Sequence, residues 1–277
     1  DKSAIFTWDF AKQDVADLIA EHAEADVDTL MVDAARQKII GVYVEGMKSE
    51  IIYFDEEYAK LQATLNASFP GQEVYFSWSG KNAVVTITGE QNVGSIYFFD
   101  TEKKVMEPLF NVKPELDGRK LSAKKVIHYA ARDGLKIPAY VTLPEGVTAK
   151  GLPLVAFIHG GPHARDSDGF DPLSQMLASR GYAVFQPQFR MSTGFGWKHH
   201  TAGWKQWGLT MQDDITDGIE HLVKEGIVDK NRVCIIGASY GGYATMYGLV
   251  KNPDLYKCGI NWVGVTDVKM LFTVNWS

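Results

Sequence analysis

One serine in this sequence has the surroundings of an activated nucleophile. Gly237-Ala238-Ser239-Tyr240-Gly241 has the form G-x-S-x-G; it follows the apolar run 233–236 and precedes a helical stretch, 240–250. Strand, sharp turn and helix are the context of a nucleophile elbow, where glycines let a crowded backbone hold the serine hydroxyl above a sheet. The pattern predicts covalent catalysis at Ser239, with the backbone N–H of Tyr240 facing the developing oxyanion.

A second motif lies 80 residues earlier. His159-Gly160-Gly161-Pro162 directly follows the apolar run 154–158. Adjacent glycines allow a backbone to approach a substrate carbonyl and turn its N–H groups inward, so we expect the second oxyanion donor in this loop. His159 belongs to the loop itself, and in folds with a nucleophile elbow the catalytic residues follow one another along the chain as Ser, then Asp or Glu, then His. We therefore expect His159 to orient the loop rather than act as the general base.

A base for the serine is missing from the sequence that follows it. The 38 residues after Ser239 contain no histidine and no glutamate, and their only aspartates are Asp254 and Asp267. Asp267 is more simply a helix cap. A serine hydroxyl without a base is a poor nucleophile. The chain alone is therefore predicted to be inactive.

Other groups of polar residues have simpler interpretations. His199-His200 has no third ligand at metal-binding spacing, so we predict no metal site. Asp213-Asp214 fits the first turn of a helix, where acidic residues complement the dipole and cap N–H groups. Cys234 and Cys258 both lie in apolar runs and are predicted to be buried thiols. No cofactor is expected.

The second half of the chain predicts the elements that position these motifs. A polar linker, 113–124, precedes alternating strand and helix patterns in 125–277, which are typical of a doubly covered, mainly parallel sheet. A helix should begin near Thr210 and end near Gly226. The strands are expected at 125–130, 137–143, 154–158, 183–186, 233–236 and 259–263.

The first half repeats itself. Apolar strands followed by an aspartate occur at Asp9, Asp55 and Asp100, with spacings of 46 and 45 residues. A period near 45 with several short strands in each unit favours β-propeller blades for 1–112, and further blades would precede Asp1. The alternative is a plain antiparallel meander with chance similarity.

Composition excludes several classes of protein. The 277 residues suggest two domains, and a net charge of -6 gives no reason to expect nucleic acid as a partner. The longest apolar run has about five residues, far fewer than the roughly 20 that span a bilayer. The glycosylation pattern at Asn66 and Asn275 is attributed to chance. The sequence indicates neither compartment nor oligomeric state.

Together with 190–196 (Arg-Met-Ser-Thr-Gly-Phe-Gly), the two motifs resemble the prolyl oligopeptidase family of serine peptidases, in its acylaminoacyl-peptidase and dipeptidyl-peptidase branches. The resemblance implies a β-propeller preceding an α/β-hydrolase domain, and short peptides as substrates. It implies Ser239 as the acylated nucleophile. The N–H groups of Tyr240 and of Gly161, with Gly160 beside it, would form the oxyanion hole.

The sequence departs from the family's pattern in two respects. Met191 stands where the family usually has glycine after Arg190, and we expect Arg190 to form scaffold ion pairs rather than contact substrate. The family's triad Asp and His would lie in the remainder of the same protein, beyond residue 277. An esterase acting on small acyl esters and a non-catalytic binding module remain as alternatives.

Overall fold

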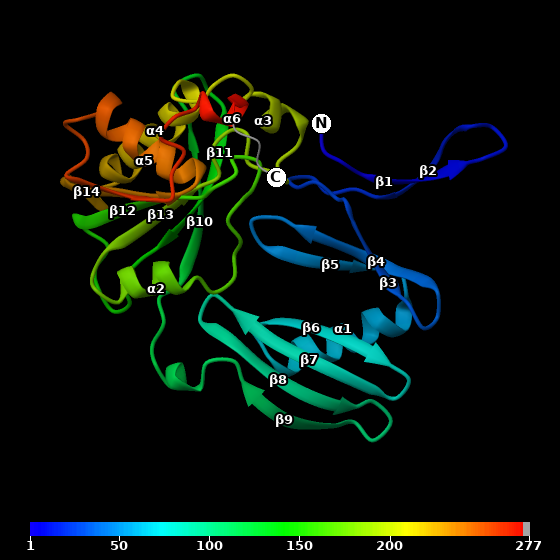
Figure 1. Cartoon of the computed structure of the whole chain (residues 1–277). Coiled ribbons are helices and arrows are strands. Elements are labelled where there is room, and N and C mark those ends of the chain that lie inside the picture. Colours follow the sequence, from blue (N-terminus) through cyan, green and yellow to red (C-terminus); the bar gives the residue numbers. More distant parts are fainter. Residues whose placement is uncertain (274–277) are drawn as a thin grey trace. The chain divides into compact units, whose positions relative to one another are not determined.

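The computed structural model describes residues 1–273, so the pattern at Asn275 lies outside the described residues. The chain divides into two compact units, which are described separately (Figure 1). One contains Asp1, 124–166 and the chain from 176 onward, and the other contains 2–123 and 167–175. The predicted domain borders, 1–112 and 125–277 with a linker between them, stay a prediction.

A six-stranded sheet organises the first unit. Its order is β10-β11-β13-β12-β14-β15; β13, β12, β14 and β15 run parallel, and β10 and β11 add antiparallel strands at one edge. Nearly every side chain of β12 and β13 is buried, as short apolar runs predict for a covered sheet. The strands are β10 (Lys124–Ala130), β11 (Lys136–Thr142), β12 (Leu152–Ile158), β13 (Ala183–Pro187), β14 (Val228–Ala238) and β15 (Cys258–Trp262).

Helices pack against this sheet. α4 places Ile215, Ile219 and Leu222 in the main core, and Gly218 lets it approach Phe185, because a Cβ there would overlap that ring. No helix in the described part of the chain is both long and apolar enough to cross a bilayer. The helices that contact the sheet are α4 (Thr210–Lys224) and α5 (Tyr240–Lys251). The other helices are α2 (Pro172–Ala178), whose residues divide between the two units, α3 (Trp197–Thr201) and α6 (Met270–Thr273).

The two aspartates of α4 do not cap it, contrary to the prediction. The N-cap is Leu209, without a side-chain cap bond. Asp214 is fully buried and accepts three bonds from Arg190, while Asp213 pairs with Arg132 and Lys251. The carboxylates serve ion pairs because the basic side chains of distant segments converge on this turn.

The prediction of buried free thiols is also wrong. Cys234 and Cys258 form a disulfide, and Cys258 is exposed. The two residues are direct partners in the β14–β15 register, with Cα atoms 4.7 Å apart, a separation at which a disulfide forms. The bond joins the strand that leads to Ser239 to its neighbour.

The second unit is antiparallel. It contains a two-stranded sheet (β1-β2), a three-stranded sheet (β3-β4-β5) and a four-stranded meander (β6-β7-β8-β9), the strand number of one propeller blade. The predicted fold class is therefore confirmed: an α/β-hydrolase sheet preceded by blade-like sheets. The strands are β1 (Ile5–Asp9), β2 (Asp14–Ala20), β3 (Thr29–Asp33), β4 (Lys38–Glu45), β5 (Ser49–Tyr53), β6 (Glu73–Ser79), β7 (Asn82–Gly89), β8 (Asn92–Asp100) and β9 (Val105–Asn111), followed by the 3-10 helix η1 (Pro114–Leu116).

The repeated aspartates have one structural role. Asp9, Asp55 and Asp100 each accept the backbone N–H groups two and three residues further on, at 2.9–3.2 Å. These bonds lower the pKa of all three carboxyls; at Asp55 the largest cause is the bond from the Lys38 ammonium. The sequence repeat therefore marks a carboxylate that accepts local N–H bonds at or after the end of a strand: it holds a turn at Asp9 and Asp100 and begins a helix at Asp55.

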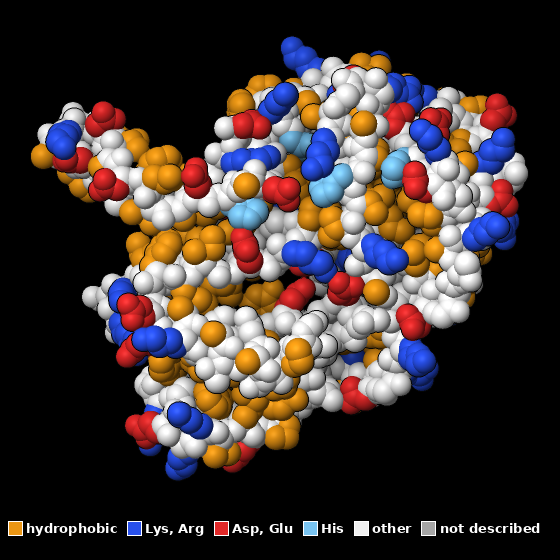
Figure 2. All heavy atoms as spheres, turned by 180° about the vertical axis from the view of Figure 1, so that it is seen from behind, with side chains coloured by type: hydrophobic (Ala, Val, Ile, Leu, Met, Phe, Trp, Pro, Cys, Tyr) orange, Lys and Arg blue, Asp and Glu red, His pale blue; other side chains and the backbone are white. Residues whose placement is uncertain are grey.

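One helix of this unit was not predicted. α1 (Glu56–Ser68) is capped by Asp55, and it buries Tyr58 and Leu65. The β1–β2 hairpin, in contrast, keeps large apolar side chains at the surface, including Phe6, Trp8 and Phe10 (Figure 2).

Candidate active site

Ser239 lies at a sharp turn between β14 and α5. Its backbone has φ +56° and ψ -117°, a conformation that residues other than glycine rarely adopt. Its N–H donates to the Trp262 carbonyl at 3.1 Å, and its own carbonyl accepts from Tyr243 at 3.1 Å. The turn holds the serine exposed while Tyr240, the first residue of α5, is fully buried. An exposed hydroxyl at the beginning of a helix fits the predicted elbow.

Glycine is required where this turn crosses its neighbours. A Cβ at Gly241 would overlap the carbonyl oxygen of Ile158, at the end of β12. A Cβ at Gly237 would lie 2.5 Å from the carbonyl of Gly241. Since real Cβ atoms do not approach backbone so closely, any side chain at either position would displace the turn.

The structure brings the glycine loop after β12 beside the serine. A Cβ built on Gly160 would lie 3.4 Å from the Cβ of Ser239 and 3.2 Å from the carbonyl oxygen of Ala238. Gly161 is exposed and has φ +113°, in the region that favours glycine. The two motifs, 80 residues apart in sequence, therefore form one site.

His159 is buried under this loop. Its Nδ1 lies 2.8 Å from the Gly160 carbonyl oxygen and its Nε2 lies 2.9 Å from the hydroxyl of Ser192. The ring stacks on Phe189, with centroids 4.4 Å apart. Burial lowers the pKa of His159 to about 4, so the ring is neutral at physiological pH.

Arg190 is also buried, between two carboxylates. Its Nε and Nη2 donate to Asp214 at 2.8 and 2.7 Å, and its Nη1 donates to Asp133 at 2.8 Å. The guanidinium thus joins the β10–β11 turn to α4. The adjacent Met191 has φ +88°, and Gly203 leaves space for its side chain, because a Cβ at Gly203 would overlap Met191. Methionine here adopts the backbone shape that glycine favours.

No base contacts the serine within the described residues, where the Ser239 hydroxyl has no histidine or carboxylate as a hydrogen-bond partner. His163 is exposed, and its ring centroid lies 5.0 Å from that of His200. Within residues 1–273, no group of three or more potential ligands is placed to hold a metal ion.

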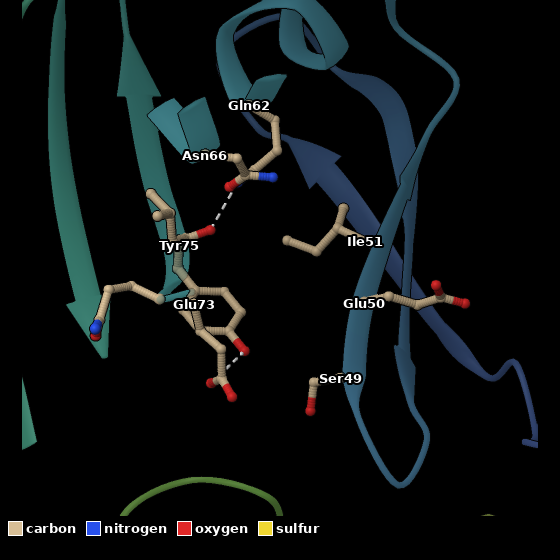
Figure 3. A pocket seen from close by; sticks show the side chains of 9 residues that line it. Ser49, Glu50, Ile51, Gln62, Asn66, Glu73 and Tyr75 are labelled. Atoms are coloured by element: carbon tan, nitrogen blue, oxygen red, sulfur yellow. Dashed lines mark hydrogen bonds between the residues drawn. The ribbon is translucent and has the colours of Figure 1, made fainter. Parts of the chain in front are cut away.

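A separate pocket lies in the antiparallel unit, between β5, α1 and β6 (Figure 3). It encloses about 240 Å³. Tyr75 points its hydroxyl toward the Glu73 carboxylate, and burial raises the pKa of Glu73. Other polar groups of the lining also have partners: Gln62 donates to the Val74 carbonyl, while Ser49 donates to Asp168, which is not a lining residue. The pocket lining has no arrangement of nucleophile and base.

Sequence reasoning missed two contributors to the site. Ser192 and Phe189, which contact the His159 ring, were given no role, although Ser192 lies in the motif around Arg190. The available signal was a small polar residue followed by Thr193-Gly194, which is typical of a tight loop that packs on another.

Known proteins resemble this chain in sequence. A family model described as the prolyl oligopeptidase family matches residues 169–276. Over 265 residues the chain is 34% identical to dipeptidyl aminopeptidase BIII of Pseudoxanthomonas mexicana, a match covering 92% of this chain and 38% of that protein. It is 30% identical to dipeptidyl peptidase family member 6 of Caenorhabditis elegans, covering 88% of this chain and 36% of that protein.

Solved structures share the fold. The chain superposes on a puromycin-hydrolyzing peptidase of Mycobacterium tuberculosis with a TM-score of 0.71 at 25% identity, covering 90% of this chain and 40% of that one. An acylaminoacyl peptidase of Pyrococcus horikoshii gives a TM-score of 0.69 at 20% identity, covering 98% and 42%. The chain thus spans about two fifths of the length of these relatives.

Proposed function

Because the chain belongs to the prolyl oligopeptidase family, we propose that it carries the nucleophile and oxyanion hole of a serine peptidase that hydrolyses short peptides. The observation that carries the proposal is the strained backbone of Ser239, exposed at the start of α5 and beside the Gly160-Gly161 loop. Strain of this kind persists where the surrounding structure enforces it, and it concentrates at catalytic positions.

In the proposed mechanism, Ser239 Oγ attacks the scissile carbonyl carbon and its proton passes to a histidine that we place in the remainder of the complete protein. The N–H groups of Tyr240 and Gly161 hold the oxyanion. The C–N bond then breaks, the amine leaves with the proton, and an acyl-enzyme remains on Ser239. Water attacks this ester, releasing the acid and restoring the hydroxyl.

The names of the relatives support the proposed substrate class. Their names include dipeptidyl aminopeptidase and acylamino-acid-releasing enzyme, both of which describe cleavage near a peptide end. We propose short peptides as substrates of the complete protein. The 277-residue chain, in which no base within residues 1–273 contacts Ser239, should show no turnover by itself.

A fluorophosphonate probe tests the nucleophile in the full-length natural protein. Peptide mapping should locate the label on Ser239, and Ser239→Ala should abolish labelling. The matched control is Ser179→Ala, which removes an exposed hydroxyl that bonds only the Met176 carbonyl of its own helix end. Labelling that survives Ser239→Ala would reject the assignment.

Substrate preference separates the peptidase from an esterase. Peptide anilides and small acyl esters should be compared by kcat/KM on the same preparation. We expect hydrolysis of both classes of substrate, and the hydrolysis of peptide anilides reports the peptide cleavage that we propose as the activity. Turnover of esters without detectable turnover of any peptide anilide would favour the esterase.

A further inference from the structure

The pocket of the antiparallel unit has a carboxylate at one end and amides at the other. Glu73, the first residue of β6, lies at the same end as Ser49 (Figure 3). Gln62 and Asn66 lie at the opposite end, and because they are four residues apart they share one face of α1. The side chain of Ile51 lies between the two ends. The pocket therefore has a negative end, an apolar middle and a polar far end.

Glu73 is the carboxylate that faces this space. Side chains alternate along β5, so Ile51 points into the pocket, whereas Glu50 points away and pairs with His22 at 3.0 Å. In the described part of the chain, the Glu73 carboxylate has one hydrogen-bond partner, the Tyr75 hydroxyl at 3.4 Å. A carboxylate has about four acceptor sites, so most of this capacity is left for a ligand.

Negative charge at this end of the pocket is only partly compensated. Within residues 1–273, neither Glu73 nor Asp168 forms an ion pair, and buried Asp168 accepts from the N–H and hydroxyl of Ser49 at 2.7 and 2.9 Å. The ammonium of Lys48 is paired with Glu90. Burial, followed by the charge of Asp168, raises the pKa of Glu73, and Lys48 offsets this only in part. A bound cation would favour the ionised carboxylate.

The pocket fits a small organic cation better than a metal ion. Calcium takes about six to eight oxygen ligands, whereas no three potential ligand side chains come together anywhere in residues 1–273. An ammonium has three N–H donors, which Glu73 and the Tyr75 hydroxyl can accept. The pocket encloses about 240 Å³, less than the roughly 300–1,000 Å³ of sites for drug-sized ligands. The ligand is therefore small, and Ile51 favours an alkyl chain in its middle.

We propose that this pocket binds a small linear alkyldiamine, with one ammonium bonded to Glu73 and Tyr75 and the other bonded to the side-chain oxygen of Asn66. That oxygen already accepts from Gln62 Nε2 at 2.8 Å and has a second lone pair for the ligand. The alkyl chain packs on Ile51 between the two ends. All residues of the site belong to the antiparallel unit, and binding there is a property beyond peptide hydrolysis that does not require the nucleophile.

Titration calorimetry of the full-length protein tests the site with three ligands of equal chain length. Cadaverine, a five-carbon diamine, should bind at one site per chain with a Kd of about 1 mM or below. Pentylamine lacks the second ammonium and should bind about tenfold more weakly. Pentanediol carries no charge and should bind more weakly still. Absence of cadaverine binding up to about 10 mM would overturn the proposal.

Glu73→Gln tests the charged end, because it removes the charge and nearly preserves the shape of the side chain. Cadaverine affinity should fall about tenfold or more. The matched control is Glu107→Gln, which removes the same charge from an exposed position on β9 and should bind cadaverine as the wild type does. Equal cadaverine affinity in Glu73→Gln and the wild type, or an equal loss in Glu107→Gln, would overturn the proposal.

Asn66→Ala tests the far end without touching the charged one, and its exposed position on α1 makes the change mild for folding. It should weaken cadaverine about tenfold and leave pentylamine unchanged, because pentylamine has no second ammonium to lose a partner. Equal weakening of both amines at a wild-type melting temperature would overturn the placement of the second ammonium.

Discussion

Removing the Arg190 guanidinium should unfold the hydrolase unit more readily, and the effect should depend on pH. Arg190→Met keeps an apolar stem but leaves Asp214, which has no solvent exposure, with only the backbone N–H of residue 190 as a donor. Breaking a buried ion pair by removing one partner costs about 3–5 kcal/mol. We expect the free energy of unfolding of the full-length protein to fall by this amount at pH 8.

The sign of the pH effect follows from Asp214. Burial raises its pKa to about 6 despite the bonds from Arg190, and loss of Arg190 should raise the pKa further. An ionised buried carboxylate destabilises the variant above its folded-state pKa. As pH falls toward the unfolded value near 3.9, the folded carboxyl binds a proton and the destabilisation shrinks. The loss should be smaller at pH 5 than at pH 8.

Urea unfolding at both pH values measures this difference. Arg232→Met is the matched control, since its ion pair with Asp229 is exposed and should contribute little. Adding Asp214→Leu to Arg190→Met should restore most of the lost stability, because an apolar pair needs no charge compensation. A loss below about 1 kcal/mol at pH 8, or an equal loss at pH 5, contradicts the reasoning.

Three further predictions concern other parts of the chain. Gly241→Ala should abolish fluorophosphonate labelling and lower the melting temperature, since a Cβ there overlaps the end of β12, whereas Gly169→Ala meets open space and should match the wild type in both assays. Alkylation without reductant, followed by mass spectrometry, should find Cys234 and Cys258 unmodified, and two alkylated thiols in the native protein would disprove the disulfide. Opening this bridge, which closes a loop of 24 residues, should lower the free energy of unfolding in urea by about 3 kcal/mol. The pKa of Asp55 is lowered in the folded state, so its ionised carboxylate stabilises the fold fully at pH values above its unfolded-state pKa. This stabilisation is lost as pH falls through the folded-state pKa. Asp55→Asn should therefore weaken the acid dependence of unfolding, and an unchanged acid transition would contradict this.

The sequence predicted those features whose signal is local. β12, β13, β14 and β15 were found because each contains a short apolar run, although β14 begins at Val228, five residues before the predicted start. The sharp turn at Ser239 was found because glycines surround it on both sides. The position of the Gly160-Gly161 loop was predicted in the same way, from two adjacent glycines directly after a strand, and its role as an oxyanion donor stays a prediction.

The missed features depend on which distant residues meet. Cys234 and Cys258 pair only because β14 and β15 are neighbours in a particular register. Asp214 bonds Arg190, which lies 24 residues earlier and beyond the reach of a local pattern, and it was expected in a first turn that contains only Asp213. α1 lies within a series of strands and was missed because this region was interpreted by its strand repeat. The spacing of Tyr58 and Leu65, which places both on one face of a helix, was overlooked.

The aspartate turns also bear on how the antiparallel unit folds. Each carboxylate bonds backbone N–H groups two or three residues away, and these bonds form almost without loop-closure entropy; Asp55 also accepts a bond from Lys38, 17 residues earlier. Local contacts of this kind form early, before strands distant in the sequence pair. Each repeat thus holds its own local contact, and we expect these contacts to form before the pairing of distant strands.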